Sequence, residues 1–435
     1  MPVTISGPRR IRGEIIAPGD KSVSHRSAMF NAIANGDATI TNFSPGADCS
    51  STVDILRALG VEIDREPGGD GRGDTLHVSG VGMLGLREPF EILDAGNSGT
   101  TTRLMSGVLA GRDMVAVLTG DESIRSRPMG RVIKPLTQMG ATVYGRKGNT
   151  LAPLVFAGGD LRGIRYEMPV ASAQLKSSLL LAGLRASGET VLVQPAKSRD
   201  HTERMFKAMG AQVLSEGLEV AVKPSELNAT DVEVPGDISS AAFWMVLGLV
   251  HADADIVIRG VGINPTRSGV LNALKWMGGD ISLENERDVA GEPIADIRVR
   301  SSDLHAAEIG GDIVPLLIDE VPVLAVAAAM GEGPTQFRDA AELRVKETDR
   351  IAATVEWLTG AGVRTESRDD GMTVFGQGRL KGGRFNSHHD HRIAMSLGVA
   401  GLVSESPITV DGAEIASISY PTFWQEVEKL GGVIE

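Results

Sequence analysis

Apolar and polar residues alternate along the chain in a pattern that recurs six times. In each copy a helical segment ends in an apolar residue and a glycine, and a run typical of a strand follows. A helix that turns sharply into a strand favours glycine, because glycine adopts the left-handed conformation without a Cβ penalty. The six turns are predicted at Gly60, Gly140, Gly210, Gly278, Gly362 and Gly431.

A second strand signal, rich in β-branched residues, lies upstream of each of these glycines. These signals begin at Ala38, Met114, Thr190, Ala254, Thr335 and Pro407. One repeat is therefore strand, helix, glycine turn and strand, with further strand material after it. A single copy would be a chance resemblance, but six ordered copies indicate a repeated α/β unit.

Six such units favour two lobes of three units over one large sheet, since a single core stops growing at about 250–300 residues. The best boundary is the polar stretch 230–235, which contains a proline and precedes a glycine. The apolar helix predicted at 241–249 then opens the fourth unit. We expect a ligand in a cleft between the two lobes.

Composition narrows the classes of partner. The chain has 435 residues, of which 42% are hydrophobic and only 4% aromatic, so the core should be aliphatic. The formal net charge of -13 argues against binding to nucleic acid or to an anionic membrane surface. Cations gathered in particular segments are better explained by a small anionic ligand.

The single cysteine and the apolar runs bear on location. Cys49 alone cannot form an intrachain disulfide or a cysteine metal site, and we expect a small buried or half-buried side chain in a reducing cytoplasm. The basic N-terminus is not followed by the apolar segment of a signal peptide. The longest apolar runs, near 241–250 and 321–330, are too short to span a membrane. A soluble, cytoplasmic protein is expected.

Residues 342–350, E-L-R-V-K-E-T-D-R, concentrate charge beside apolar neighbours. The pattern predicts a helix that places Lys346 and Arg350 one turn apart, with Glu347 beside them. A solvated helix face is the alternative. Four other cationic segments favour an anion site: P-G-D-K-S-V-S-H-R at 18–26, G-N-S-G-T-T-T-R at 96–103, S-R-P-M-G-R at 126–131 and D-H-R at 390–392.

Several of these segments lie at predicted helix starts, where free backbone N–H groups attract anions. The glycines of 96–103 allow close backbone approach before a helix predicted at 101–110. Simple turns and N-caps are the alternative for the segments at helix starts, and an isolated surface arginine is the alternative for Arg127. The candidates are Lys21, Ser22 and Arg26, then Arg127, and then the pairs Ser172 with Gln174 and Ser198 with Arg199.

Two carboxylates, Asp319 and Glu320, precede a very apolar helix. They cap that helix, or Asp319 against an apolar wall serves as a general base. His391 has no second histidine at metal-site spacing other than its neighbours His388 and His389, so no metal site is predicted.

Taken in order, these segments together with S-A-Q-L-K-S and D-H-R-I-A-M resemble the 5-enolpyruvylshikimate-3-phosphate synthase family over essentially the whole chain. The resemblance implies a two-lobed inside-out α/β barrel of six βαβαββ repeats, three per lobe, with the active site in the interlobe cleft. The lobes would be residues 19–233 and residues 1–18 with 234–435, the first strand of the latter coming from the N-terminus.

The resemblance implies transfer of the enolpyruvyl group of phosphoenolpyruvate to the 5-hydroxyl of shikimate 3-phosphate, with no cofactor or metal. Asp319 would accept the hydroxyl proton, and Glu347 with Lys21 or Lys346 would move the protons of the methylene carbon. Residues that would bind shikimate 3-phosphate are Lys21, Ser22, Arg26, Ser172, Ala173, Gln174, Ser198, Arg199, Asp319 and Lys346. Those that would surround phosphoenolpyruvate are Lys21, Asn97, Gly99, Arg127, Gln174, Glu347, Arg350 and Arg392.

The chain departs from some family members at three positions. Ala173 stands where some carry serine, Glu342 where some carry asparagine, and Ile418 where many carry a lysine near phosphoenolpyruvate. Gly99, which has no methyl group, should leave room for the family's inhibitor glyphosate. A monomer is expected.

Two other functions remain open. The sister enolpyruvyl transferase acts on UDP-N-acetylglucosamine and uses a reactive cysteine in a mobile loop, whereas Cys49 lies outside any arginine-rich loop. A non-catalytic anion-binding protein would use the same cations. Asp319 and Glu347 argue against that function, since carboxylates weaken anion binding.

Overall fold

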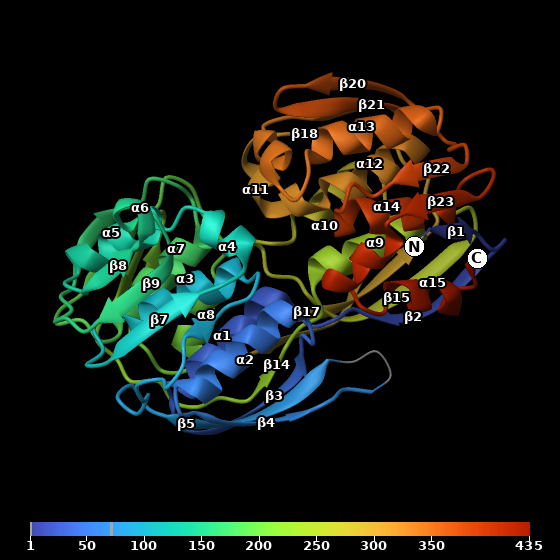
Figure 1. Cartoon of the computed structure of the whole chain (residues 1–435). Coiled ribbons are helices and arrows are strands. Elements are labelled where there is room, and N and C mark those ends of the chain that lie inside the picture. Colours follow the sequence, from blue (N-terminus) through green and yellow to red (C-terminus); the bar gives the residue numbers. More distant parts are fainter. Residues whose placement is uncertain (1, 70–72) are drawn as a thin grey trace. The chain divides into compact units, whose positions relative to one another are not determined.

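The computed structural model describes residues 2–69 and 73–435 of the chain (Figure 1). The chain divides into two compact units. Unit 1 contains Met1–Pro18, Gly236–Arg287 and Pro293–Glu435, and unit 2 contains Gly19–Pro235 and Asp288–Glu292.

Unit 2 is built on three four-stranded sheets, with strand orders β14-β3-β5-β4, β6-β7-β9-β8 and β10-β11-β13-β12. Its elements are α1 (Lys21–Ala32), β3 (Asn35–Phe43), α2 (Ala47–Ala58), β4 (Glu62–Glu66), β5 (Asp74–Val81), β6 (Leu93–Asp94), α3 (Gly99–Leu109), β7 (Val115–Thr119), α4 (Glu122–Ser126), α5 (Gly130–Gln138), β8 (Val143–Gly145), α6 (Arg146–Asn149), β9 (Leu151–Ala157), β10 (Arg165–Glu167), α7 (Ala173–Gly183), β11 (Thr190–Val193), α8 (His201–Ala208), β12 (Val213–Glu216), β13 (Glu219–Val222) and β14 (Val232–Glu233).

Unit 1 has three further four-stranded sheets, with orders β16-β17-β15-β2, β18-β19-β21-β20 and β22-β23-β1-β24. Its elements, with 3₁₀ helices marked η, are β1 (Val3–Ser6), β2 (Ile11–Ile16), α9 (Ile238–Val250), β15 (Ala254–Gly262), α10 (Gly269–Trp276), β16 (Asp280–Val289), β17 (Glu292–Arg300), β18 (Glu308–Ile309), η1 (Gly311–Ile313), α11 (Val314–Leu317), η2 (Ile318–Glu320), α12 (Val321–Met330), β19 (Glu332–Phe337), η3 (Ala341–Val345), α13 (Arg350–Gly360), β20 (Arg364–Arg368), β21 (Gly371–Gln377), β22 (Gly383–Asn386), α14 (His391–Gly401), β23 (Ile408–Asp411), η4 (Ala413–Ile418), α15 (Phe423–Lys429) and β24 (Val433–Ile434).

All six sheets have the same internal pattern. Each contains one parallel pair, such as β6 with β7, whose second strand then pairs with an antiparallel neighbour, such as β9. A parallel pair needs a crossover, and helices supply it in the four pairs whose strands are consecutive in the chain, such as β6 and β7. The predicted α/β fold of six βαβαββ repeats, three in each unit, is confirmed.

Strands distant in sequence complete three of the sheets. Strand β14 pairs with β3 at the other end of unit 2. The N-terminal segment supplies two strands to unit 1, where the sequence indicated one, because β2 pairs with β15 and β1 lies between β23 and β24.

The six predicted glycine turns are confirmed. Each glycine follows the second helix of its repeat and has a positive φ between 84° and 106°. These angles lie in the region that L side chains avoid, so the turn requires glycine.

Two of these turns differ in what an added methyl group would meet. A Cβ on Gly140 would lie 2.3 Å from the Asp160 carbonyl oxygen, whereas one on Gly60 would lie 3.1 Å from the flexible Arg87 side chain. We expect both alanine variants to lose about 1–2 kcal/mol to the left-handed backbone. Gly140→Ala should lose clearly more, since the backbone carbonyl cannot move aside. Urea denaturation of the two variants checks this, and equal losses would contradict it.

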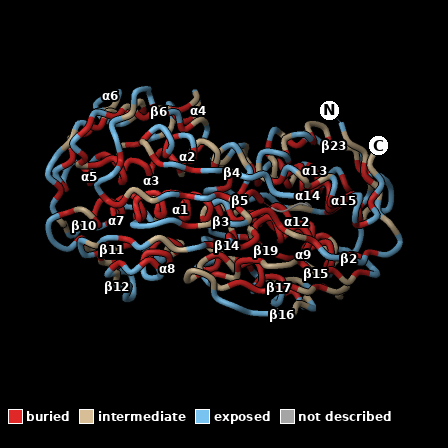
Figure 2. Tube along the Cα trace, turned by 90° about the horizontal axis from the view of Figure 1, so that it is seen from below, coloured by how far each residue is buried: buried red, intermediate tan, exposed pale blue. Residues whose placement is uncertain are grey.

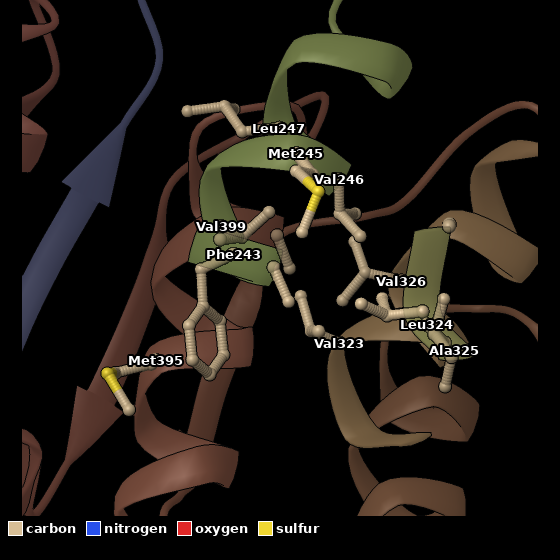
Figure 3. Close-up of a cluster of buried hydrophobic side chains, with 14 of the residues drawn as sticks. Phe243, Met245, Val246, Leu247, Val323, Leu324, Ala325, Val326, Met395 and Val399 are labelled. Atoms are coloured by element: carbon tan, nitrogen blue, oxygen red, sulfur yellow. The ribbon is translucent and has the colours of Figure 1, made fainter. Parts of the chain in front are cut away.

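One helix of every repeat is almost fully enclosed. In unit 1 these are α9, α12 and α14, whose side chains meet in the cluster of buried hydrophobic residues that Figure 3 shows. In unit 2 they are α1, α3 and α7, which are mostly coloured as buried (red) in Figure 2. Helices α9 and α12 are apolar almost all round, and such helices are stable only when other elements cover every face.

The apolar stretch before β19 is longer than the sequence pattern indicated. Gly311–Met330 is apolar and long enough to cross a membrane by length and composition, whereas the sequence pattern indicates only the shorter run 321–330. Of its 18 most apolar consecutive residues, 72% are buried inside unit 1. It is also divided into η1, α11, η2 and α12, so packing in the core accounts for its composition.

Candidate functional site

In unit 2, the start of α1 presents the first of the predicted cations. Asp20 caps the helix, its carboxylate accepting from the Val23 N–H at 2.8 Å. Lys21, the first helical residue, is half exposed and its Nζ lies 2.9 Å from Asp48 Oδ2. Burial alone would raise the pKa of Asp48, but the Lys21 ammonium outweighs it and the pKa is lowered. Lys21 is thus held by a carboxylate that the sequence did not single out.

Arg26, one turn further along α1, is buried and fully engaged. Its Nε donates to Thr202 Oγ1 at 2.8 Å, its Nη2 to Ser177 Oγ at 2.8 Å and its Nη1 to the Ser22 carbonyl at 2.9 Å. Burial lowers the pKa of Arg26 to about 10, so it remains protonated at neutral pH. The residue therefore ties α1 to α7 and α8 and fixes where Ser22 lies.

A buried chain of hydroxyls links α1 to the glycine-rich turn. His25 Nδ1 lies 2.7 Å from Thr52 Oγ1, which lies 2.8 Å from Thr101 Oγ1, which donates to Ser98 Oγ at 2.7 Å. Burial lowers the pKa of His25 to about 3, so its ring is neutral. Ser98 in turn caps α3 by accepting from the Thr101 N–H. The chain fixes the position of Gly99.

Gly99 opens α3, two residues before the predicted helix start, and lies against two guanidinium groups. A Cβ on Gly99 would lie 2.7 Å from Arg103 Nη1 and 3.3 Å from Arg127 Nη1. Arg127 donates to Ser123 Oγ at 3.1 Å and to Asn97 Oδ1 at 3.4 Å. The structure thus brings Asn97, Gly99 and Arg127 together, as an anion site needs.

Arg103 belongs to this group but was not predicted as a site residue. It donates to Gln174 Oε1 at 2.7 Å, and Gln174 Nε2 donates to Thr100 Oγ1 at 2.9 Å. Burial, with Arg131 and Arg127 nearby, lowers the pKa of Arg103 to about 10. The segment G-N-S-G-T-T-T-R contained it, but its sequence position alone did not distinguish it from an arginine on the outer face of the helix.

Ser172 and Ser198 behave differently from each other. Ser172 caps α7 as predicted, accepting from the Leu175 N–H at 3.3 Å, and Ala173 is the first residue of that helix. Ser198 does not cap α8. Its hydroxyl donates to Gln194 Oε1 at 2.5 Å, and Asp200 occupies the N-cap position of α8. Arg199, which lies between Ser198 and Asp200 in the chain, is half-buried.

In unit 1, the helix predicted across 342–350 does not form, and that prediction was wrong. Residues Ala341–Val345 form the 3₁₀ helix η3, and α13 begins only at Arg350. Asp349 explains the break, because its carboxylate caps α13 by accepting from the Ala352 N–H at 2.9 Å.

Arg350 nevertheless lies at the centre of a charged cluster. It is 2% exposed and its guanidinium contacts three carboxylates: Asp390 at 2.7 Å, Glu347 at 2.7 Å and Asp319 at 3.3 Å. Lys346 Nζ lies 3.6 Å from the same oxygen of Asp319. The expected convergence of Lys346, Glu347 and Arg350 is therefore present, although a bend and not a helix produces it.

The Asp319–Glu320 pair does not cap α12, contrary to one of the two alternatives. Both residues lie in η2, and no side chain caps the helix that follows. Glu320 is buried, accepts from Ser239 Oγ and lies 3.4 Å from Arg392 Nη1. Burial raises the pKa of Glu320 despite Arg392. Asp319 is more exposed, at 22%.

Asp390, which the sequence did not single out, organises the start of α14. One of its oxygens accepts from the Arg392 N–H at 2.8 Å, and the other accepts from Arg350. Burial lowers the pKa of the neighbouring His391 to about 4, so its ring is neutral. The backbone before it is unusual, because His388 and His389 both have positive φ, 51° and 56°.

The two departures in unit 1 have visible consequences. Glu342 forms an ion pair with Lys346 at 2.9 Å, which an asparagine would not. Ile418, the last residue of η4, is 61% exposed and brings no cation to its surroundings.

The described residues offer neither a cluster of metal ligands nor a reactive cysteine. Within residues 2–69 and 73–435, no group of three or more His, Cys, Asp or Glu side chains could hold a metal ion. Cys49 is buried, as predicted, and burial raises the pKa of its thiol to about 12, so it is a poor nucleophile.

The sequence and the fold match one family throughout. The family model described as EPSP synthase (3-phosphoshikimate 1-carboxyvinyltransferase) matches residues 5–427. A 3-phosphoshikimate 1-carboxyvinyltransferase from Synechococcus elongatus is 52% identical over 97% of this chain and 94% of its own length. Another, from Citrifermentans bemidjiense, is 51% identical over 99% of both. A solved EPSP synthase from Acinetobacter baumannii superposes with a TM-score of 0.93 at 44% identity, covering 100% of this chain and 99% of that one.

Proposed function

Because the chain belongs to the EPSP synthase family, we propose that the groups of unit 1 and unit 2 described above carry out the family's reaction. That reaction transfers the enolpyruvyl group of phosphoenolpyruvate to the 5-hydroxyl of shikimate 3-phosphate and releases phosphate, a step of the shikimate pathway to aromatic amino acids. The observation that carries the assignment of roles is the contact of Asp319 with both Lys346 and Arg350. Phosphate release from the two substrates tests it.

Shikimate 3-phosphate is assigned mainly to unit 2. Ser172, Ser198 and Arg199 bind its phosphate, and Ser22 with Arg26 binds its hydroxyls and carboxylate. Ala173 and Gln174 contribute from the first turn of α7, whose free N–H groups favour an anion. From unit 1, Asp319 and Lys346 contact the ring.

Phosphoenolpyruvate is assigned to the arginine groups of both units. Arg127 beside Asn97 and Gly99, together with Lys21 and Gln174, supplies one set of donors. Arg350 and Arg392, with Glu347, supply the other. Guanidinium groups suit this ligand, because their paired N–H donors match carboxylate and phosphate oxygens.

The proton transfers are assigned to the charged side chains of the site. Asp319 takes the proton from the 5-hydroxyl as its oxygen attacks C2 of phosphoenolpyruvate, and Glu347 with Lys21 or Lys346 protonates the methylene carbon. The tetrahedral adduct then loses a proton from the resulting methyl group as phosphate leaves. Addition followed by elimination thus needs a base and an acid that can reverse its role.

Gly99→Ala tests the phosphoenolpyruvate assignment. Its methyl group would press on Arg103 and Arg127. We expect KM for phosphoenolpyruvate to rise by about tenfold, the loss of one good charged hydrogen bond. KM for shikimate 3-phosphate and the melting temperature should change little. Steady-state kinetics check this, and an unchanged KM for phosphoenolpyruvate would refute it.

We propose that glyphosate inhibits the wild-type enzyme through the same space at Gly99. The Gly99→Ala variant should then need a higher glyphosate concentration for half inhibition. Wild-type activity that persists at saturating glyphosate would sink this assignment.

We further propose a monomeric, cytoplasmic enzyme. The single buried cysteine suits a reducing compartment. Light scattering on purified protein tests the monomer, and fractionation of expressing cells tests the location.

A further inference from the structure

A fully buried ion pair lies inside unit 2, next to the segment assigned to the shikimate phosphate. Lys176 on α7 is 1% exposed and Glu203 on α8 is 3% exposed. The Lys176 Nζ lies 2.6 Å from Glu203 Oε1. Neither residue was predicted as part of the site.

Lys176 also reaches the segment that carries Ser198. Its Nζ donates to the Ser198 carbonyl oxygen at 3.2 Å, and its backbone N–H donates to the Ser172 carbonyl at 3.0 Å. One residue is thus bonded to both serines assigned to the phosphate.

Residues 194–200, which include Ser198, form no helix or strand, so side chains must hold them in place. Gln194 holds Ser198 from the other side, since its Oε1 accepts from the Ser198 N–H at 3.3 Å and from the Ser198 hydroxyl. Lys176 and Gln194 therefore fix opposite ends of the same residue. A phosphate dianion benefits from donors held in place before it binds.

Packing alone does not require a lysine at this position. The α7 neighbours Leu175, Leu179 and Leu180 are fully buried and apolar. A buried ion pair is costly to desolvate, and a well-packed apolar pair is often at least as stable. The charge is accordingly explained by the hydrogen bond that Lys176 makes to Ser198.

We propose that Lys176, held by Glu203, is a positioning residue that fixes Ser198 relative to Ser172 for binding of the shikimate phosphate. Lys176 acts through Ser198 and does not move a proton in the reaction. This inference rests on the proposed function, because it needs Ser172 and Ser198 to be phosphate ligands.

The test replaces both members of the pair, Lys176→Met with Glu203→Leu, so that neither charge is left buried alone. We expect KM for shikimate 3-phosphate to rise by about tenfold, as loss of a charge-assisted hydrogen bond predicts. At saturating shikimate 3-phosphate, kcat and KM for phosphoenolpyruvate should stay within about twofold of wild type, since the pair touches no group assigned to that substrate.

A matched control removes another ion pair of unit 2. Arg65→Met with Asp74→Leu disrupts a partly buried pair on β4 and β5 that makes no contact with Ser198. All its kinetic constants should remain near wild type. A second variant, Gln194→Met, leaves the Lys176–Glu203 pair intact and should also raise KM for shikimate 3-phosphate alone.

The possible outcomes distinguish failure of the proposed function from failure of the positioning role alone. Wild-type enzyme that releases no phosphate would overturn the proposed function itself. An active wild type whose double variant and Gln194→Met variant keep a normal KM for shikimate 3-phosphate would overturn only the positioning role. A folded double variant in which kcat falls and the KM values for both substrates rise to a similar extent would also overturn the positioning role. A general structural role would then explain the result. If the double variant does not fold, Gln194→Met alone decides.

Discussion

Asp319→Asn lowers kcat by about 10²–10⁴-fold, the range expected when a general base is lost. Asparagine keeps the size of the side chain and one acceptor oxygen but cannot take the proton of the attacking hydroxyl. The contacts with Lys346 and Arg350 lose their charge but not their geometry. Because Asp319 is partly exposed to solvent and asparagine has the same size, the melting temperature should change little. Steady-state measurement of kcat at saturating substrates checks the prediction.

The matched control for this variant is Asp312→Asn. Asp312 is an exposed aspartate of η1, in the same stretch of chain before α12. It should retain wild-type kcat. If Asp319→Asn keeps kcat within about threefold of wild type, well short of the effect of losing a general base, another group accepts the proton and the assignment is wrong.

Arg350→Met destabilises the protein by about 3–5 kcal/mol, because it leaves the fully buried Asp390 without its counter-ion. It also removes the partner of Glu347 and Asp319, so activity should be lost. The free energy of unfolding, measured by urea denaturation at neutral pH, gives the size of the effect.

The pH dependence of this loss follows from the pKa of Asp390. Burial alone would raise that pKa, but Arg350 outweighs burial and the pKa is lowered. In wild type the ionised carboxylate therefore stabilises the fold above its unfolded pKa, and this contribution is lost as pH falls. In Arg350→Met only the smaller effects of His391 and the Arg392 N–H still oppose burial, so the folded state binds a proton more readily than the unfolded state. The stability gap between the two proteins should thus narrow as pH falls from 7 towards 5.

A second substitution separates the charge from the packing. Asp390→Asn can still cap α14 but carries no charge. The double variant Arg350→Met with Asp390→Asn should regain most of the stability that Arg350→Met loses. Equal stability of the single and double variants would mean that the buried charge is not the cause.

Local rules were enough to predict the repeat from the sequence. The six glycines end helices with positive φ, and the strands fall where β-branched residues recur. Pairing of distant strands was not readable in this way. Strand β14 closes the β3 sheet, and β1 and β2 join two different sheets, because such pairings depend on tertiary packing that leaves no local pattern.

The candidate site was predictable where motif residues cluster in sequence. Lys346, Glu347 and Arg350 do converge, yet the helix expected to bring them together is interrupted, since Asp349 caps a new helix and overrides the periodic pattern. The partners Asp48 and Asp390 were missed because their contacts lie 27 and 40 residues away in the chain. Composition gives no sign of such contacts.

Phosphate release from phosphoenolpyruvate is the most direct measurement of the central claim. It should be run with shikimate 3-phosphate and, in parallel, with UDP-N-acetylglucosamine as the acceptor, on wild type and on Lys21→Ala. We expect release with shikimate 3-phosphate only, and loss of that release in the variant. Release with the nucleotide sugar only, or with neither acceptor, would contradict it.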